Sequence, residues 1–113
     1  MDCLFCKIIN NEIPGDKVFE DDQVLAFNDI NPQGPTHVLI VPKQHITTIN
    51  DITPQNNELL GHMLNTAKNI AFERNISTDG YRLIFNVNVN GGQAVYHIHL
   101  HLIGGRAMNW PPG

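Results

Sequence analysis

One stretch near the end of the 113-residue chain decides the fold, and it reads Tyr96-His97-Ile98-His99-Leu100-His101-Leu102-Ile103. Histidine alternates here with an aliphatic residue, which is the two-residue period of a β-strand. We therefore expect a strand over residues 96–103, with the three imidazoles on one face and the aliphatic side chains on the core face. Neighbouring Cα atoms on one face of a strand lie roughly 6.5 to 7 Å apart, so adjacent imidazoles could share a ligand.

Two chemistries could use such a face. The three imidazoles could bind a catalytic metal ion with an open position, or one imidazole could attack a phosphate while the next moves protons. Gly91-Gly92-Gln93 directly precedes the predicted strand, and a glycine turn exposes N–H donors to phosphoryl oxygens. The glycine turn before the predicted strand therefore favours the phosphate site over the metal site. Neutral imidazole is a competent nucleophile near pH 7, because its pKa lies close by.

The segments before the histidine strand predict an α+β domain with a mostly antiparallel sheet. Apolar spacing predicts a short amphipathic helix over residues 3–10, a hairpin from residues 18–20 and 24–30, and a buried strand over residues 37–41 that Pro42 ends. Another strand is expected over residues 81–88. The glycines between it and the histidine strand allow a positive φ and close approach of the backbone.

One long helix is expected over residues 54–74. Thr53-Pro54 is a good start, because it combines a capping hydroxyl with proline at the first helical position. The apolar residues that follow form one stripe at helical spacing: Leu59, Leu60, Met63, Leu64, Ala67, Ile70 and Ala71.

Length and composition narrow the class of protein. The 113 residues, 42% hydrophobic and 16% charged, suit a single globular domain over residues 1–113. No run of eighteen apolar residues is present to span a membrane, and no secretory signal opens the chain, so a cytoplasmic location is expected. The net charge of −4, with seven scattered basic residues, argues against a nucleic-acid polymer as partner.

The histidine run resembles the signature of the histidine triad (HIT) family. Further motifs resemble the Hint branch of that family over nearly the whole chain: Asp29-Ile30-x-Pro32-x-x-Pro35-x-His37, Ile40-Val41-Pro42-Lys43-x-His45, Gly80-Tyr81-Arg82, Gly91-Gly92-Gln93 and the ending from Gly104-Gly105-Arg106 to Trp110-Pro111-Pro112-Gly113. The resemblance implies a HIT-like fold with a five-stranded sheet that continues across a homodimer. It also implies hydrolysis of purine nucleoside phosphoramidates through a covalent nucleotidyl-histidine, with AMP or GMP released from an amine.

The resemblance assigns the site residues by motif position. His99 would be the nucleophile, His101 would bind phosphate and assist the leaving group, and His37 would support His99. The apolar base pocket would be formed by Phe5, Ile8, Phe27 and Ile30, and the carboxylate of Asp29 would bind the ribose. The phosphate subsite would be formed by Asn86, Gly92, Gln93 and Val95. Trp110 would be an aromatic residue that could reach a partner's site.

Two positions bear on the activity that the resemblance implies. His101 stands where transferases of the wider superfamily carry glutamine, which favours hydrolysis. Ala94 stands where Hint-type sequences commonly carry serine, so a hydroxyl near the phosphate and the leaving group is missing. The missing hydroxyl would affect the rate and the preference for leaving groups.

Cys3 and Cys6 form a Cys-x-x-Cys pair, which in a cytoplasmic protein indicates metal binding or redox chemistry. In some bacterial HIT proteins a Cys₂His₂ site is completed by two histidines that correspond here to His45 and His97. The resemblance thus implies a structural zinc that braces the N-terminal helix and takes no part in the chemistry. The other interpretation is two free buried thiols. His62, in the long helix, is interpreted as structural.

Four functions therefore stand side by side. They are a nucleotidyl-histidine hydrolase without a catalytic cofactor, a hydrolase of dinucleoside polyphosphates, a zinc hydrolase built on His97, His99 and His101, and a nucleotide-binding interaction protein with incidental activity.

Overall fold

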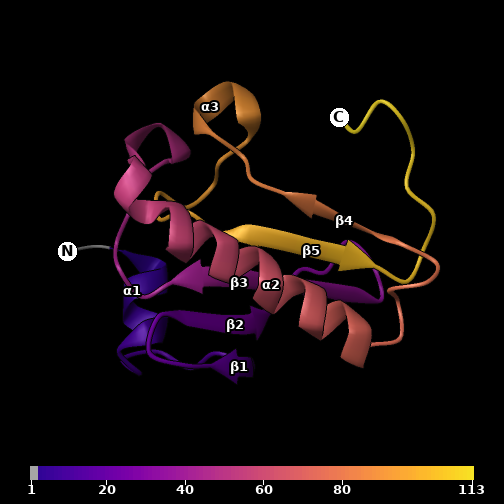
Figure 1. The fold of residues 1–113 in the computed structure, drawn as a ribbon, viewed down its shortest axis with the longest axis horizontal. Helices are drawn as coiled ribbons and strands as arrows, with labels where there is room; N and C mark the ends of the chain where they lie inside the picture. Colours follow the sequence, from indigo (N-terminus) through magenta and orange to yellow (C-terminus); the bar gives the residue numbers. More distant parts are fainter. Residues whose placement is uncertain (1–2) are drawn as a thin grey trace.

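The computed structural model describes residues 3–113. Its elements in chain order are α1 (Leu4–Ile9), β1 (Lys17–Glu20), β2 (Val24–Asn28), β3 (Thr36–Pro42), the 3₁₀ turns η1 (Ile49–Asp51) and η2 (Pro54–Asn56), α2 (Asn57–Glu73), β4 (Tyr81–Ile84), α3 (Asn88–Gly91) and β5 (Leu100–Gly104). The strands form one five-stranded antiparallel sheet in the order β1-β2-β3-β5-β4 (Figure 1). The predicted α+β class, with one long and one short N-terminal helix, is confirmed.

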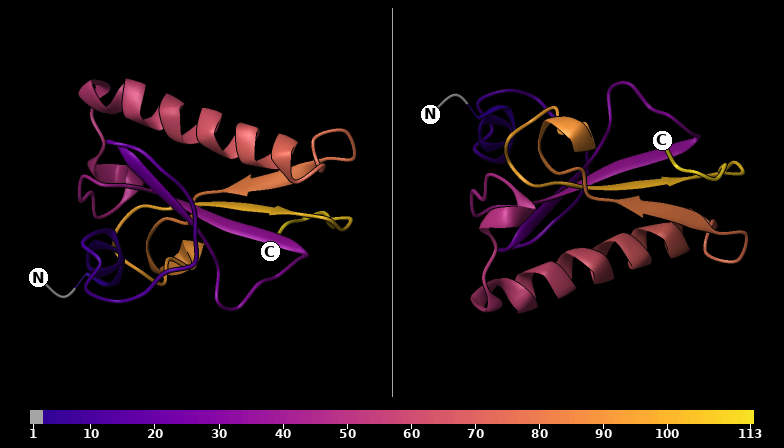
Figure 2. Two further views of the ribbon diagram at one scale, coloured as in Figure 1. Left: turned by 90° about the horizontal axis from the view of Figure 1, so that it is seen from below. Right: turned by 90° about the horizontal axis from the view of Figure 1, so that it is seen from above.

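The sheet separates two cores. Helix α2 covers one face, while α1 and α3 lie on the other (Figure 2). The larger core packs α2 against alternate residues of the central strands, and it contains Val38, Ile40, Met63, Ala67, Ile70, Ile98, Leu100 and Leu102. The smaller core joins α1 to the opposite face through Phe5, Ile8, Leu25, Phe27, Leu39 and Val41. Within residues 3–113, no helix has the length and apolar character needed to cross a membrane.

Helix α1 begins and ends close to the predicted boundaries. Cys3 is its N-cap, and the Cys3 Sγ accepts a hydrogen bond from the backbone N–H of Cys6 at 3.2 Å. The helix buries Phe5 and Ile8. Both cysteines are thus placed at the first turn, on the side of the sheet that carries the histidines.

The predicted hairpin is confirmed. β1 and β2 pair antiparallel, and the carboxylate of Asp21 in the turn accepts hydrogen bonds from the backbone N–H groups of Gln23 and Val24 at 2.8 and 2.9 Å. The predicted buried strand is also confirmed, as β3, with Pro42 as its last residue.

The long helix differs from its prediction at the start and on its surface. The first turn after Thr53 winds as the 3₁₀ turn η2, where the N–H of Thr53 donates to Asn56 Oδ1 at 2.9 Å, and α2 begins at Asn57. The apolar stripe is buried as expected at Met63, Ala67, Ile70 and Ala71. Leu59 and Leu60 are partly buried against the same core, whereas Leu64 is 45% exposed.

The two C-terminal strands are shorter than predicted. β4 ends at Ile84, because the chain turns into α3 with positive φ angles at Asn88 and Gly92. β5 begins only at Leu100, where its ladder to β3 ends on the pair Ile40↔Leu100. The alternation of the sequence persists beyond the ladder, since Ile98 is buried in the larger core with Leu100 and Leu102. His97 and His99 therefore lie in a segment without ladder hydrogen bonds.

Candidate active site and metal centre

The three alternating histidines enter three different environments. His97 is fully buried beside the two cysteines, His99 is 6% exposed on the wall of a cavity, and His101 is half-buried on β5 next to His37. The rings of His99 and His101 are neighbours, with centroids 4.9 Å apart. Among the described residues, two groups of side chains lie close enough together to hold a metal ion. One combines His97 with Cys3, Cys6 and His45, and the other combines His101 with Asp29 and His37. The single three-histidine metal site considered from the sequence is therefore not formed.

The hydrogen bonds of His99 define its tautomer. Its Nδ1 lies 2.8 Å from the backbone carbonyl oxygen of His97, which can only accept, so Nδ1 carries the proton. The lone pair of the neutral ring is then on Nε2. Burial lowers the pKa of His99, although the hydrogen bond to His97 and the charge of Asp29 oppose this shift. His99 is thus a neutral imidazole whose Nε2 is free to act as a nucleophile.

His37 contacts His101, whereas the resemblance implied support of His99. The reason is the register of β3 and β5: His37 is opposite Ile103 and Leu39 is opposite His101, so His37 lies diagonally across from His101 on the same face. The His37 Nε2 is 2.9 Å from His101 Nδ1. No contact between His37 and His99 is found in the described residues.

A chain of hydrogen bonds defines the tautomers of this pair. The backbone N–H of Gln33 donates to His37 Nδ1 at 3.0 Å, so neutral His37 carries its proton on Nε2. That N–H donates to His101 Nδ1, and the carboxylate of Asp29 lies 3.4 Å from the same Nε2. His101 consequently holds its own proton on Nε2 and can donate it to a ligand.

Burial keeps these histidines neutral. It lowers the pKa of His101 from 6.5 to about 4, with smaller contributions from His99 and His37, while Asp29 acts in the opposite direction. Burial also lowers the pKa of His37, again opposed by Asp29. At neutral pH the site therefore offers one lone pair, on His99, and one N–H donor, on His101.

The cavity beside His99 holds most of the predicted substrate-binding residues. Its volume is about 360 Å³, and α1, β2, the loop after β2 and the segment around α3 contribute to its wall. The predicted residues on this wall are Phe5, Ile8, Phe27, Asp29, Ile30, Asn86, Gly92, Val95, His99 and His101. Phe5 packs edge-on against both Phe27 and His99, with ring centroids 5.5 and 5.0 Å apart. The apolar part of the cavity thus adjoins the imidazole of His99.

Two predicted residues lie outside this cavity. The side chain of Gln93 turns inward, where its amide donates to the carbonyls of Thr47 and Val95 and its oxygen accepts from the N–H of Asn88. Gln93 therefore shapes the turn after α3 instead of facing the cavity. Trp110 is 85% exposed and lines a second cavity of about 750 Å³, which also includes His37 and His101. His101 is thus shared between the two cavities.

The cavity wall includes Ala94, the position where the resemblance notes a missing hydroxyl, and four residues that the sequence did not single out: Leu4, Ile13, Pro14 and Leu39. Leu39 could have been found from its spacing, since it is two residues from His37 on the same strand face. For Ile13 and Pro14 no sequence signal exists, because the loop between α1 and β1 brings them to the wall.

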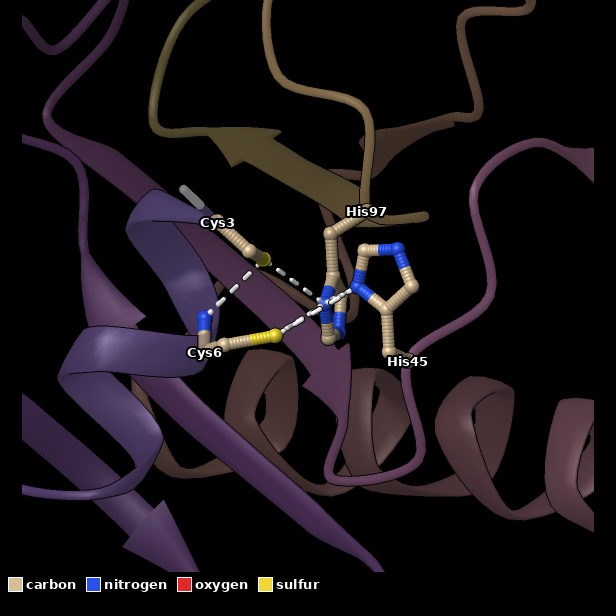
Figure 3. A group of neighbouring side chains, drawn as sticks. All are labelled: Cys3, Cys6, His45 and His97. Atoms are coloured by element: carbon tan, nitrogen blue, oxygen red, sulfur yellow. Dashed lines mark hydrogen bonds between the residues drawn. The ribbon is translucent and has the colours of Figure 1, made fainter. Parts of the chain in front are cut away.

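Cys3, Cys6, His45 and His97 form one compact cluster, as predicted from the resemblance. Figure 3 shows the four side chains pointing toward one another from α1, from the loop after β3 and from the segment before β5. The His97 Nδ1 is 3.4 Å from Cys3 Sγ, 3.5 Å from Cys6 Sγ and 3.1 Å from His45 Nδ1. Ligand atoms about 2.0–2.3 Å from a tetrahedral zinc lie roughly 3.3–3.8 Å from one another. The cluster therefore fits a Cys₂His₂ zinc site.

The tautomer of His97 supports the same conclusion. Its Nε2 lies 2.7 Å from the carbonyl oxygen of Pro42 and so carries the proton, which leaves the Nδ1 lone pair facing the cysteines. An imidazole that ligates a metal commonly donates its other N–H to such a carbonyl. Burial, followed by the influence of Cys3, raises the pKa of Cys6 to about 11, so a metal ion would have to displace the thiol proton.

Comparisons with known proteins identify the family. Residues 2–110 match the family described as scavenger mRNA decapping enzyme C-term binding. The purine nucleoside phosphoramidase of Escherichia coli is 53% identical over 105 residues, which cover 93% of this chain and 88% of that protein. The 14 kDa zinc-binding protein of Zea mays is 51% identical over 112 residues, covering 97% and 87%.

A solved structure agrees with these relatives. The crystal structure of a HIT family hydrolase from Legionella pneumophila is similar with a TM-score of 0.98 and 61% identity, covering 99% of this chain and 100% of that one. The fold, the histidine run and these matches lead to one conclusion: the chain belongs to the histidine triad family.

Proposed function

We propose that the protein is a nucleotidyl hydrolase that cleaves a purine nucleoside phosphoramidate into the nucleoside monophosphate, AMP or GMP, and an amine. The observation that carries this proposal is the unprotonated Nε2 of His99 on the wall of an apolar cavity, beside the Nε2–H of His101. The 53% identical relative named purine nucleoside phosphoramidase supports the same substrate class.

The reaction would proceed in two halves. Nε2 of His99 attacks the α-phosphorus, so that a bond from phosphorus to His99 forms and the bond to the amine nitrogen breaks. The amine takes up one proton as it leaves. Water then attacks phosphorus, gives up one proton and releases the nucleotide from His99, so the protein gains no net proton. The carbonyl of His97 accepts the Nδ1–H of His99 throughout and stabilises the positive charge that the attack places on the ring.

The cavity suits a nucleotide in this orientation. The side chains of Phe5, Phe27 and Ile30 offer apolar surface for a purine, and the carboxylate of Asp29 can accept a hydrogen bond from a ribose hydroxyl. One oxygen of Asp29 already accepts the N–H of Asn31 at 2.8 Å, which holds the carboxylate in place. Asn86, Gly92 and Val95 complete the proposed phosphate end of the cavity.

Zinc is the proposed metal for the cluster of Cys3, Cys6, His45 and His97. A zinc ion bound there would tie α1 to the sheet and supply no reacting group, because all four positions are filled by protein side chains.

A homodimer is proposed from the edge of the sheet. In the described part of the chain β4 is an edge strand that pairs with β5 alone. Leu83 on β4 and Trp110, which line the same cavity, are 36% and 85% exposed. A second copy that pairs along β4 would cover this edge and could bring Trp110 to the partner's site. Sedimentation equilibrium tests this proposal, and a monomer at micromolar concentration would refute it.

The hydrolase proposal is tested by incubating the protein with adenosine 5′-phosphoramidate and measuring the release of AMP and of the amine. Denaturation at alkaline pH during turnover should trap AMP bound to His99, because the bond from phosphorus to imidazole is hydrolysed in acid and survives in base, and mass spectrometry of the peptide that contains His99 identifies it. Binding of AMP with no turnover would instead support the interaction protein, which Ala94 on the cavity wall favours because it provides no hydroxyl. Assays with a dinucleoside polyphosphate as substrate, run in parallel, test whether the protein is instead a hydrolase of dinucleoside polyphosphates.

A further inference from the structure

The segment that carries the proposed nucleophile lacks the support of the sheet. The ladder between β3 and β5 ends at Leu100, so no ladder hydrogen bond holds residues 97–99. A segment without ladder bonds opens more easily than a strand. Some other set of contacts must therefore hold His99 in place.

Two of these contacts run from the backbone and side chain of the segment to the end of β3 and the loop that follows it. The N–H of Ile98 donates to the carbonyl of Ile46 at 2.8 Å, and the Nε2–H of His97 donates to the carbonyl of Pro42 at 2.7 Å. Ile46 is the direct neighbour of His45. The loop that supplies one member of the Cys/His cluster thus also holds the residue between His97 and His99.

The remaining contacts come from α1. His97 faces Cys3 and Cys6 through its Nδ1, and Phe5, which lies between the two cysteines in sequence, packs edge-on against the ring of His99 at a centroid distance of 5.0 Å. Phe5 also lies 6.1 Å from the ring of His97. The same helical turn therefore contacts both histidines.

His97 connects the cluster to the nucleophile through its own backbone. Its side chain is part of the cluster, and its carbonyl oxygen accepts the Nδ1–H of His99 at 2.8 Å. The position of that carbonyl decides whether the proton of His99 stays on Nδ1 and the lone pair on Nε2. A shift of His97 would remove this acceptor and allow the other tautomer, in which Nε2 cannot attack.

We propose that His97 is a positioning residue for the reaction: held as a ligand together with Cys3, Cys6 and His45, it fixes the tautomer and position of His99. Metal occupancy of the cluster then controls the rate of the chemical step, in addition to bracing α1. This inference rests on the proposed role of His99 and differs from a purely structural role of the metal, which would change stability alone.

His45→Ala is the test variant, because His45 is a ligand that does not line the nucleotide cavity. The wild type should bind one Zn²⁺ or Co²⁺ per chain, and the variant should bind it far more weakly. At a temperature where both proteins are folded, kcat of the variant should fall about 10- to 100-fold while KM and the affinity for AMP change less than about threefold. The ¹⁵N signals of His99 should change from the Nδ1–H tautomer to a mixture.

Two matched variants act as controls. His45→Cys retains a ligand of the right kind and should restore metal binding, kcat and the tautomer of His99. His62→Ala removes a histidine that lies outside the cluster and pairs with Asp21, so none of the three readouts should change. Wild-type protein stripped of metal by a chelator repeats the comparison without any substitution, which keeps the test valid if His45→Ala does not fold.

The proposal is overturned if the wild type binds neither metal, or if metal removal leaves kcat and the His99 tautomer unchanged and lowers only the melting temperature. Failure of the proposed hydrolase function gives a different result, namely a wild type without turnover. The metal-dependent change in the ¹⁵N signals of His99 is measured independently of turnover.

Discussion

Nε2 of His37 lies 2.9 Å from Nδ1 of His101, and this contact decides which nitrogen of His101 carries the proton that faces the cavity. The backbone N–H of Gln33 occupies the other nitrogen of His37, so the direction of the hydrogen bond is defined. The structure thus divides the site into two systems: His99 with the carbonyl of His97, and His101 with His37 and Asp29.

Substituting His37 tests the second system. In His37→Ala the Nδ1 of His101 loses its donor, and His101 can move its proton away from the ligand. We expect kcat to fall about 10-fold or more with a smaller change in KM. His37→Gln should retain part of the activity, because its amide can donate to His101. Steady-state kinetics on phosphoramidates whose leaving amines differ in basicity measure kcat and KM of the three proteins. Equal kcat in the wild type and both variants would contradict the role of His37.

Substituting His99 tests the first system. His99→Ala removes the attacking nitrogen but leaves the cavity wall, so kcat should fall by about 10³-fold or more while AMP still binds. Calorimetric titration with AMP and a sensitive assay of AMP release measure the two effects. Substantial remaining turnover by a folded variant would show that another group attacks phosphorus.

The pH dependence of stability follows from the lowered pKa of His101. Its pKa is about 4 in the folded protein and 6.5 when unperturbed, so between these values the unfolded chain binds more protons. The free energy of unfolding should therefore fall as the pH decreases through 6.5 toward 4. Urea denaturation of chelator-treated protein at pH 7, 6 and 5 measures this trend. His101→Gln should show a shallower slope, and identical slopes would exclude His101 as a source.

Ile30 offers a separation of binding from stability. It lines the cavity and is 100% exposed, so Ile30→Ala should change the free energy of unfolding by less than about 0.5 kcal/mol. If a purine covers Ile30, AMP affinity should fall about 5- to 10-fold, from the loss of roughly 1 kcal/mol of apolar contact. Val89→Ala is the matched control, since Val89 is 82% exposed and outside the cavity. Equal AMP affinity of both variants and the wild type would place the base elsewhere.

Ala94 tests the effect of the missing hydroxyl. Ala94 is exposed and lines the cavity, so Ala94→Ser should fold without loss of stability. The added hydroxyl can hydrogen-bond the phosphate or the leaving amine and should raise kcat/KM for amine leaving groups several-fold. Parallel assays of both proteins with two different amines measure the change. If Ala94→Ser and the wild type have the same kcat/KM for each of the two amine leaving groups, the hydroxyl does not reach the reacting group.

Much of the fold could be predicted because the patterns that encode it are local. The alternation around Leu100 assigned Ile98 and Leu102 to the core, and Thr53-Pro54 marked the start of the long helical region. Strand ends were less predictable, since they depend on a neighbour. β5 begins at Leu100 because the chain before it leaves the β3 ladder, where the N–H of Ile98 donates to the carbonyl of Ile46 in the loop after β3. Leu64 is exposed because α2 presents a narrower stripe to the sheet.

The site was predicted in its residue types and less well in its contacts. The motif resemblance brought together Cys3, Cys6, His45 and His97, and the structure forms this cluster. The same resemblance placed Gln93 at the phosphate end, yet its amide is bonded inside the turn. Side chains a few residues apart on an irregular segment can turn either way, and only packing decides between them.

The sequence by itself determined the chemistry available to this protein: three histidines at strand spacing, a Cys-x-x-Cys pair and a histidine on a neighbouring strand. The tertiary structure alone decided what each histidine does, because a tautomer depends on the partner that each ring nitrogen meets. The register of β3 and β5 placed His37 against His101, and the end of the ladder left His99 to the carbonyl of His97. The partner of His101 depends on strand pairing between residues far apart in sequence, and the partner of His99 depends on an irregular backbone segment. The spacing of residues in the sequence reveals neither of these partners.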